Sequence, residues 1–313
     1  MITTVTLNPC IDRTVVTQNI SPGGYNSVIS SREDFAGKGI NVSAALANFG
    51  VESTAITLDF LDSGRTFASW LSTQQFSRRL IPVPGKLRTN IKIFDEQNSQ
   101  MTEFNEKGEF IQESALTNIW NTLMDSARLS YTMVLSGSLP PGIPPRFYFD
   151  VIQALRSVNP EINVVLDASG EGLKAALPAS PTVIKPNLFE LETAFDVKLT
   201  TPQEIVTFCQ SLCTQFGIGM VCVSMGKDGA LMVAPQSAYQ ADGLPLSIQS
   251  AQGAGDAMVA GICRGMVEGQ DLAGLLRFGM ASSAATISQP GTLMGTEMDF
   301  RRFFPQVTIR PIV

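Results

Sequence analysis

A repeating order of short apolar strands and polar loops constrains the fold of this chain more than any other feature. Strands are expected at residues 131–135, 163–166, 182–184 and 220–223, and each ends in a loop rich in Gly, Pro, Asn or Asp. Helix-forming segments fill the intervals, and strands that alternate with helices form a parallel, doubly wound sheet. Because the carboxyl ends of parallel strands meet at one edge, we expect the polar loops to form a ligand site there.

The composition of the chain argues against several classes of function. The chain has 313 residues, of which 44% are hydrophobic and 16% charged, as expected of a folded soluble protein. Its net charge of −6 argues against general nucleic-acid binding, which usually requires a basic surface. The sequence contains no histidine, which excludes Ser-His-Asp and Cys-His catalysis and histidine metal ligands.

The cysteines and the N-terminal segment predict a cytoplasmic location. The five cysteines include no C-x-x-C pair, and an odd number without a disulfide framework is typical of a reducing compartment. The N-terminus has no charged segment followed by a long apolar run, so no signal peptide is expected. No stretch reaches the ~18 unbroken apolar residues of a membrane span, so no membrane partner is expected.

The segment Gly253-Ala254-Gly255-Asp256 has the residue types of an anion-binding helix start. The two glycines allow successive N–H groups to turn toward one point, where the helix dipole is positive. Such a hole can receive the charge that develops on phosphoryl oxygens, while the adjacent carboxylate takes a proton from an attacking hydroxyl. The alternative interpretation is an ordinary Gly-rich turn with a capping Asp.

A second turn, around Gly37-Lys38-Gly39-Ile40-Asn41, combines close backbone approach with a cation and an amide. These groups suit a hydroxylated, phosphorylated ligand, although a helix start with a solvated lysine is the alternative. The turn is not a Walker A loop, because G-x-x-x-x-G-K-[ST] is absent.

Asn187 and Glu190 lie one helical turn apart, so their side chains face the same way. Amide and carboxylate oxygens could hold Mg²⁺ through water, because this ion prefers hard oxygen ligands and keeps much of its hydration. The alternative interpretation is a helix cap with a capping-box Glu.

Two segments, 12–35 and 87–105, interrupt the alternation of strands and helices. Both alternate polar and apolar residues around polar turns, which predicts a small four-stranded sheet apart from the main one. We expect residues 1–11, 36–86 and 106–313 to form the core. The small sheet would be a discontinuous lid, not an independent domain, that covers an active site or another subunit.

Short motifs along the chain resemble those of the ribokinase-like carbohydrate kinases, and more closely their phosphofructokinase-B branch. In chain order they are Thr6-Leu7-Asn8-Pro9 with Asp12, Gly37-Lys38-Gly39-Ile40-Asn41-Val42, Arg88-Thr89-Asn90-Ile91-Lys92, Thr102-Glu103-Phe104-Asn105, Ser136-Gly137-Ser138-Leu139-Pro140-Pro141-Gly142, Lys185-Pro186-Asn187-x-x-Glu190, Ser224-x-Gly226-x-x-Gly229 and Gly253-Ala254-Gly255-Asp256. Each motif alone is weak, but the ordered set spans nearly the whole chain and is specific.

The resemblance implies an ATP-dependent, Mg²⁺-using sugar kinase. Its expected fold is a three-layer α/β/α sandwich with a mainly parallel central sheet and a β-sheet lid. By motif position, the implied catalytic residues are Asp256 as the base and Gly253, Ala254 and Gly255 with it as the anion hole. The implied sugar contacts are Asp12, Gly37, Lys38 and Asn41, with Arg88 on the existing phosphate. The implied nucleotide and magnesium residues are Lys185, Asn187, Glu190, Ser224, Gly226 and Gly229. A homodimer formed through the lid is also implied.

Three of the motifs, Leu-Asn-Pro, Arg-Thr-Asn and Thr-Glu-x-Asn, are most similar to those of 1-phosphofructokinases and tagatose-6-phosphate kinases. The expected reaction converts fructose 1-phosphate and ATP to fructose 1,6-bisphosphate and ADP. The alternatives are a tagatose-6-phosphate kinase, another sugar or nucleoside kinase of this fold, and a sugar-phosphate sensor without catalysis. A Rossmann-type dehydrogenase is disfavoured, because Asn8-Pro9 stands where G-x-G-x-x-G would follow the first strand.

Three positions depart from the pattern of the branch. Ala36 replaces a glycine, and Ala251-Gln252 replace a Thr or Ser and a small apolar residue before the anion-hole segment. Ser27 stands where close relatives often carry a lid arginine for the sugar phosphate, which weakens the case for a phosphorylated substrate. Lys38 and Arg88 remain as phosphate contacts. Arg13 and Arg32 are possible substitutes for the missing arginine.

Overall fold

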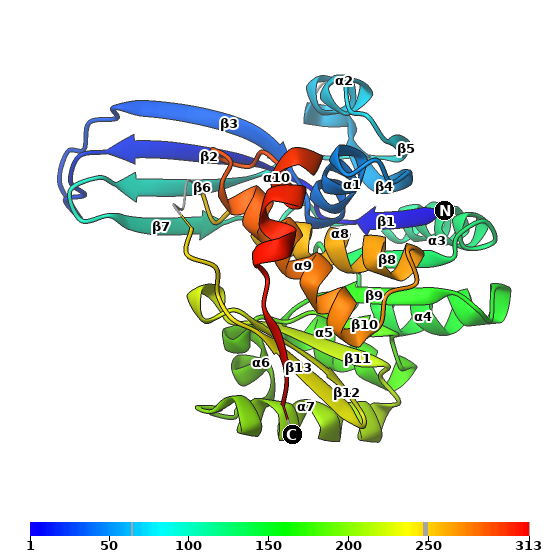
Figure 1. The fold of residues 1–313 in the computed structure, drawn as a ribbon. Coiled ribbons are helices and arrows are strands. Elements are labelled where there is room, and N and C mark those ends of the chain that lie inside the picture. The colour runs from blue at the N-terminus through cyan, green and yellow to red at the C-terminus, as the bar shows by residue number, and fades with distance from the viewer. Residues whose placement is uncertain (64, 247–249, 313) are drawn as a thin grey trace.

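The computed structural model describes residues 1–63, 65–246 and 250–312, and its largest element is a ten-stranded sheet (Figure 1). Its strands, in the order in which they lie side by side, are β14 (Ile309–Pro311), β13 (Ser237–Ala241), β12 (Ala230–Ala234), β11 (Met220–Ser224), β10 (Val183–Ile184), β9 (Asn163–Asp167), β8 (Thr132–Ser136), β1 (Ile2–Thr6), β4 (Ser53–Phe60) and β5 (Ser77–Val83). The strands from β5 to β11 are parallel, which confirms the predicted doubly wound sheet. The antiparallel extension β12–β14 was not predicted.

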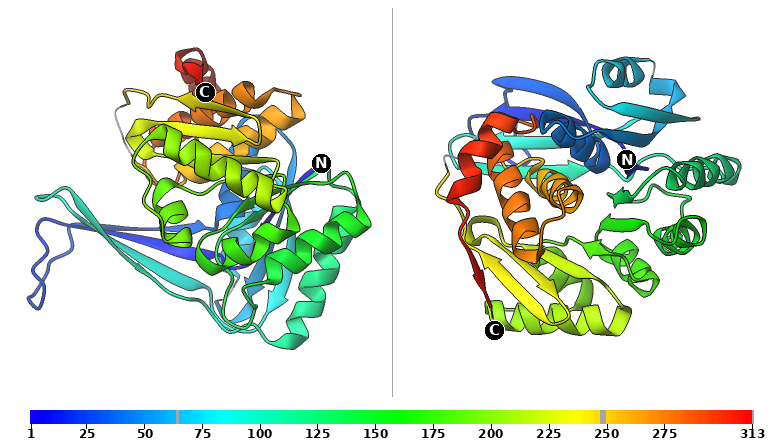
Figure 2. Two further views of the ribbon diagram at one scale, coloured as in Figure 1. Left: turned by 90° about the horizontal axis from the view of Figure 1, so that it is seen from below. Right: turned by 45° about the vertical axis from the view of Figure 1, so that its right-hand side comes forward.

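Helices cover both faces of this sheet, so the core is a three-layer sandwich as expected (Figures 1 and 2). One layer contains α1 (Lys38–Asn48), α8 (Ala254–Val267), α9 (Leu272–Ile287) and α10 (Glu297–Phe303). The other contains α3 (Glu113–Ala127), α4 (Phe147–Val158), α5 (Gly170–Ala176), α6 (Leu188–Phe195) and α7 (Pro202–Phe216), and the short helix α2 (Thr66–Ser72) connects β4 to the edge strand β5. Short 3₁₀ turns are η1 (Leu61–Ser63), η2 (Leu177–Ala179), η3 (Gly226–Asp228) and η4 (Phe304–Gln306).

The sheet strands are buried on both faces because helices lie above and below them. In β9, Val164 and Leu166 enter the apolar core on the α3–α7 side, whereas Val165 enters the core on the α1 and α8 side. This alternation follows from the two-residue period of a strand and explains the continuous apolar runs that predicted it. Within the described ranges, no helix combines the length and the apolar character needed to cross a bilayer.

The second sheet has four strands and projects from the edge of the core (Figures 1 and 2). Its strands, in spatial order, are β3 (Ser30–Ala36), β2 (Cys10–Thr17), β6 (Arg88–Asp95) and β7 (Gln100–Asn105). Strands β2 and β6 run parallel, and the two outer strands are antiparallel to their neighbours. We refer to this sheet as the lid.

The register of the lid strands determines which side chains share a face. Asp12 lies directly opposite Asn90 on β6, and Thr14 lies opposite Lys92 on β6 and Arg32 on β3. Because successive side chains point to opposite faces, all five belong to one face of the lid. All five side chains on that face line one of the two cavities described below.

Candidate active site

Two cavities open on either side of the N-terminus of α8. The first, of about 1260 Å³, lies under the lid and is lined by Gly253 and Asp256 together with all the predicted sugar-side residues, namely Asp12, Gly37, Lys38, Asn41 and Arg88. The second, of about 1220 Å³, is lined by Ala254 and Gly255 and by four predicted nucleotide-side positions, namely Asn187, Ser224, Gly226 and Gly229. Ala251 borders both cavities. The start of α8 is therefore the boundary between the two cavities, and it separates the predicted sugar contacts from four of the predicted nucleotide contacts.

The N-terminus of α8 presents backbone donors that bond to no acceptor in residues 1–63, 65–246 and 250–312. Its N-cap is Gly253, with φ of 73°, a conformation that favours glycine. Among the described residues, the amides of Gly253, Gly255 and Asp256 donate to no protein acceptor. Asp256 lies in the first turn of α8 and not at its cap, so the predicted capping alternative is wrong. The unpaired amides and the helix dipole together make this end electropositive.

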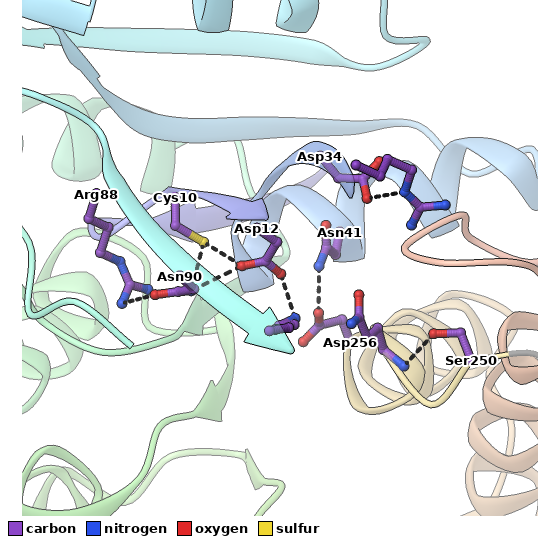
Figure 3. Close-up of polar contacts among 11 residues, drawn as sticks. Cys10, Asp12, Asp34, Asn41, Arg88, Asn90, Ser250 and Asp256 are labelled. Carbon is purple, nitrogen blue, oxygen red and sulfur yellow. Dashed lines mark hydrogen bonds and ion pairs between the residues drawn. The ribbon is translucent and has the colours of Figure 1, made fainter. Parts of the chain in front are cut away.

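Asp256 is buried at the boundary of the two cavities. Its Oδ2 atom accepts a hydrogen bond of 2.8 Å from Asn41 Nδ2, as Figure 3 shows. Burial raises the pKa of Asp256 to about 6, although the positive charge of Lys38 opposes this shift. A carboxylate with this pKa is ionised at neutral pH but basic enough to accept a proton during a reaction.

Lys38 and Asn41 reach this point because α1 packs closely on the central strand. A Cβ atom at Gly39 would lie 2.7 Å from the carbonyl oxygen of Val5, so only glycine fits. The N-terminus of α1 has no side-chain cap and faces the first cavity. Gly39 therefore allows α1 to approach β1 closely, as the sequence of this turn predicted.

A cluster of two lysines and one aspartate lies beside Asp256, in which Asp167 and Lys185 are buried and Lys38 is partly exposed. Asp167, at the end of β9, is 1% exposed, and its Oδ1 atom lies 3.2 Å from Lys38 Nζ and 3.3 Å from Lys185 Nζ. Burial alone would favour the neutral acid, but the two lysines hold the pKa of Asp167 below its ordinary value. Its Oδ2 atom is buried and has no hydrogen-bond partner within the described ranges. Asp167 directly follows the strand expected at residues 163–166, and no motif predicted that it belongs to the site.

Lys185 lies against the start of α8 although it lines neither cavity. A Cβ atom at Gly255 would lie 3.3 Å from Lys185 Nζ, so the ammonium is close to the free amides. The pKa of Lys38 lies above its ordinary value. Burial alone would lower this pKa, but the nearby carboxylates of Asp167, Asp256 and Glu190 raise it by more. Two ammonium groups, which share the Asp167 carboxylate, thus lie near the N-terminus of α8.

On the lid side of the first cavity, Asp12 is held by three donors (Figure 3). Asn90 Nδ2 donates to Asp12 Oδ1 at 3.0 Å, and Lys92 Nζ contacts Asp12 Oδ2 at 2.7 Å. Cys10 Sγ donates to Asp12 Oδ1 at 3.4 Å, because burial and the nearby carboxylate raise the pKa of the thiol to about 12. Asp12 was predicted from its motif position, whereas no role was predicted for Asn90 or Lys92. The alternation of residues 88, 90 and 92 on one strand face was the available signal.

Arg88 is the predicted phosphate contact, and its guanidinium bonds only to neutral groups. Its Nε and Nη2 atoms donate to the carbonyl oxygen of Asn8 at 3.2 and 3.1 Å, and Nη1 donates to the carbonyl oxygen of Glu106 at 2.8 Å. Within the described part of the chain, no carboxylate lies within 4.0 Å of this guanidinium. Arg88 therefore brings to the cavity a guanidinium that forms no ion pair among the described residues.

The two arginines that were possible substitutes for the missing lid arginine have different positions. Arg32 lines the first cavity and pairs with Asp34, with Nε 2.7 Å from Oδ2. Arg13 pairs with Glu33 and lies on the opposite face of the lid, because residue 13 alternates with Asp12 along β2. The prediction that Arg13 could substitute is therefore wrong, and only Arg32 faces the cavity.

Asn187 and Glu190 form the capping box that was the alternative interpretation of this pair. Asn187 Oδ1 accepts from the Glu190 amide at 2.7 Å, and Glu190 Oε2 accepts from the Asn187 amide at 2.9 Å. Glu190 borders the first cavity and Asn187 the second. Within the ranges that the structure describes, no three His, Cys, Asp or Glu side chains form a metal-ligating group. The capping box nevertheless fixes a carboxylate between the two cavities.

The other departures from the family pattern lie at separate places. Gln252 lines the first cavity, and its Oε1 atom is buried without a hydrogen-bond partner in the part of the chain that the structure describes. Ala36 also lines this cavity and is buried at the end of β3. Ser27 is exposed in the β2–β3 connection and borders neither cavity. The five cysteines are all buried and free, as the composition predicted.

Comparisons with known proteins agree with this arrangement. Residues 5–297 match the family model described as pfkB family carbohydrate kinase. The chain is 32% identical to the 1-phosphofructokinase of Borreliella burgdorferi over 91% of each chain. It is 34% identical to the 1-phosphofructokinase of Rhodobacter capsulatus over 93% of this chain and 91% of that protein. The structure is similar to crystalline phosphofructokinase-2 from Escherichia coli in complex with potassium, with a TM-score of 0.89 and 28% identity over 97% of this chain and 98% of that one. The chain therefore belongs to the pfkB family of carbohydrate kinases, has a ribokinase-like fold and is a phosphotransferase with an alcohol group as acceptor.

Proposed function

We propose that this kinase transfers the γ-phosphoryl group of ATP to a hydroxyl of fructose 1-phosphate, giving fructose 1,6-bisphosphate and ADP. The observation that carries this proposal is the position of Asp256, a buried carboxylate at the boundary between the two cavities and beside the free amides of α8. An acceptor hydroxyl in the first cavity and a phosphoryl donor in the second would meet there.

In the proposed reaction, Asp256 accepts the proton of the attacking sugar hydroxyl. The hydroxyl oxygen forms a bond to the γ-phosphorus as the bond between that phosphorus and ADP breaks. The amides of residues 253–256 stabilise the charge on the transferring oxygens, with the ammonium groups of Lys38 and Lys185 nearby. Asn41 orients Asp256 through its hydrogen bond.

The sugar phosphate is proposed to bind under the lid. Asp12 and Asn41 offer an acceptor and an amide to sugar hydroxyls, and Gly37 allows the backbone to approach closely. Arg88 is the proposed phosphate contact, because its guanidinium has no carboxylate partner among the described residues. A planar guanidinium with free donors matches the geometry of a phosphate group.

ATP is proposed to bind along the second cavity, beside Ser224, Gly226 and Gly229. Asn187 and Glu190 are proposed to hold Mg²⁺ through water. Their donor atoms are hard oxygens, and Glu190 borders the first cavity while Asn187 borders the second, so the residues fit this ion. Bound Mg²⁺ neutralises phosphate charge.

The choice of fructose 1-phosphate over tagatose 6-phosphate is supported by the relatives, since the similar curated proteins carry the name 1-phosphofructokinase. The test is ADP release from ATP and Mg²⁺ with fructose 1-phosphate, tagatose 6-phosphate, fructose 6-phosphate and unphosphorylated sugars at matched concentrations. The proposal predicts the highest kcat/KM with fructose 1-phosphate. A higher value with another sugar would overturn the substrate but not the kinase assignment.

We also propose that residues 12–35 and 87–105 act as the lid of this site and join two copies of the chain in the cytoplasm. Tyr25, Val28, Ile29 and Phe104 are exposed apolar side chains on the lid, and such groups favour burial in an interface. A related E. coli phosphofructokinase-2 has been crystallised in a tetrameric inhibited form. Sedimentation should give a dimer for the wild type and a monomer for Phe104→Glu.

A further inference from the structure

Lys92 is a buried lysine on the cavity face of the lid. The residue is 8% exposed, and its Nζ atom lies 2.7 Å from Asp12 Oδ2. Asp12 is itself 7% exposed, so the two charges are largely removed from water. Burying either charge without the other would be costly, so each residue depends on the other in this position.

The Lys92 side chain extends along the lid and not straight across to the neighbouring strands. Its direct neighbour on β7 is Glu103, whereas its direct neighbour on β2 is Thr14. The ammonium nevertheless pairs with Asp12, two residues nearer the root of the lid than Thr14, and Glu103 is not within ion-pair distance in the described structure. The ammonium group therefore lies nearer than the Lys92 backbone to the end of the lid that joins the core.

The hydrogen bonds around Asp12 leave a defined acceptor direction. Its Oδ1 atom already accepts from Asn90 and from Cys10, whereas Oδ2 accepts from Lys92 alone among the described residues. Each carboxylate oxygen has about two acceptor sites, so Oδ2 keeps one free. This free acceptor lies on the cavity face and suits the O–H group of a sugar.

We propose that Lys92 is a positioning residue for sugar recognition: it holds the Asp12 carboxylate so that the free acceptor of Oδ2 faces the bound sugar. Selection among sugars then depends on whether a hydroxyl reaches this acceptor. The substrate used in the test rests on the proposed function, but the role of Lys92 does not depend on which sugar phosphate the enzyme prefers.

The first test separates sugar recognition from catalysis. Lys92→Met should raise the KM for the sugar phosphate by about 10- to 100-fold, because it leaves Asp12 buried without its cation. The kcat and the KM for ATP should change less than about threefold, since Asp256 and the second cavity are untouched. Lys92→Arg, which keeps a cation, should recover most of the sugar affinity. Lys86→Met, at an exposed lysine near the start of β6, is the matched control and should change nothing.

A double-mutant cycle tests whether Lys92 acts through Asp12. If it does, Lys92→Met should change the sugar KM by less than about threefold in an Asp12→Asn background. Independent losses of about tenfold or more from each substitution would mean that Lys92 contacts the sugar or its phosphate by itself, and would overturn the positioning role. A fall in kcat of Lys92→Met with an unchanged sugar KM would also overturn it. Thermal melting of each variant tests folding, and Lys92→Arg carries the test if Lys92→Met does not fold.

The wild type is assayed first, with the panel of sugars given above. If another sugar phosphate proves to be the substrate, the cycle is run with that sugar, so failure of the proposed substrate and failure of the Lys92 proposal are separate results.

Discussion

Asn41 and Asp256 are joined by a hydrogen bond of 2.8 Å although 215 residues separate them in the chain. Asn41 lies in the first turn of α1 and Asp256 in the first turn of α8, and these two helices share one apolar core. Packing of the helices thus sets the orientation of the carboxylate. The same geometry explains why the most informative stretches of sequence lie at opposite ends of the chain.

Asp256→Asn should fold and bind ATP but lose nearly all turnover. The substitution keeps the size of the side chain and removes its basicity, and a general base typically contributes about 100- to 10,000-fold to the rate. The kcat measured by ADP release should fall by a factor in this range, while ATP affinity measured by titration calorimetry stays within about threefold. Turnover close to that of the wild type would contradict the assignment of Asp256 as the base.

The pH dependence of kcat/KM should have an acid limb with an apparent pKa of about 6, because Asp256 has its pKa raised to about 6 by burial. The base is active when ionised, so kcat/KM should fall as the pH decreases through this value. Asn41→Ala removes a hydrogen bond that lowers the pKa of Asp256, so its acid limb should move to higher pH. An unchanged limb in this variant would mean that another group controls it.

Gly253→Ala should reduce both stability and turnover. The backbone at Gly253 has φ of 73°, and an added Cβ would lie 2.4 Å from Met294 Cε. Gly269→Ala is the matched control, because Gly269 has φ of 68° with no atom within 4 Å of the added Cβ. Both variants should lose about 1–2 kcal/mol of unfolding free energy from the left-handed conformation. Only Gly253→Ala should also lower kcat. Equal kcat values for the two variants, each measured under conditions in which it is folded, would contradict the role of this turn.

Arg264→Met should destabilise the protein without changing its catalysis. The Arg264 side chain is 13% exposed, its Nη1 atom lies 2.6 Å from Glu297 Oε2, and its guanidinium lies 4.4 Å from the ring centre of Phe300. Loss of the ion pair and the cation–π contact should cost about 2 kcal/mol in denaturant unfolding. The exposed pair of Arg146 and Asp150 is the control, and Arg146→Met should cost less than about 1 kcal/mol. Equal costs would mean that burial of Arg264 adds nothing.

The sequence predicted the local features of the site well because each depends on neighbouring residues. The glycines around Asp256 and Lys38 indicated helix starts with free amides, and the Asn187–Glu190 spacing indicated a helical turn. The parallel strands β8–β11 were predictable because strands that are buried on both faces have continuous apolar runs.

Features that depend on distant residues were not predictable from spacing. Lys38 pairs with Asp167 across 129 residues, and Lys92 pairs with Asp12 across 80 residues, so neither pair appears in a local pattern. The edge strand β5 was missed because it contains polar residues and Pro82, which weaken a strand signal but are tolerated at an edge. Strands β11, β12 and β13 follow one another as antiparallel neighbours with no α-helix between them. The alternation of strands and helices that predicted the sheet therefore did not extend to β12 and β13.

The most direct test of the central claim is ADP release by the wild type and Asp256→Asn with ATP, Mg²⁺ and fructose 1-phosphate. We predict saturable ADP release by the wild type that requires the sugar phosphate and is lost in Asp256→Asn. The absence of sugar-dependent ADP release from a folded wild type with every sugar and sugar phosphate tested would contradict the account and favour a sugar-phosphate sensor.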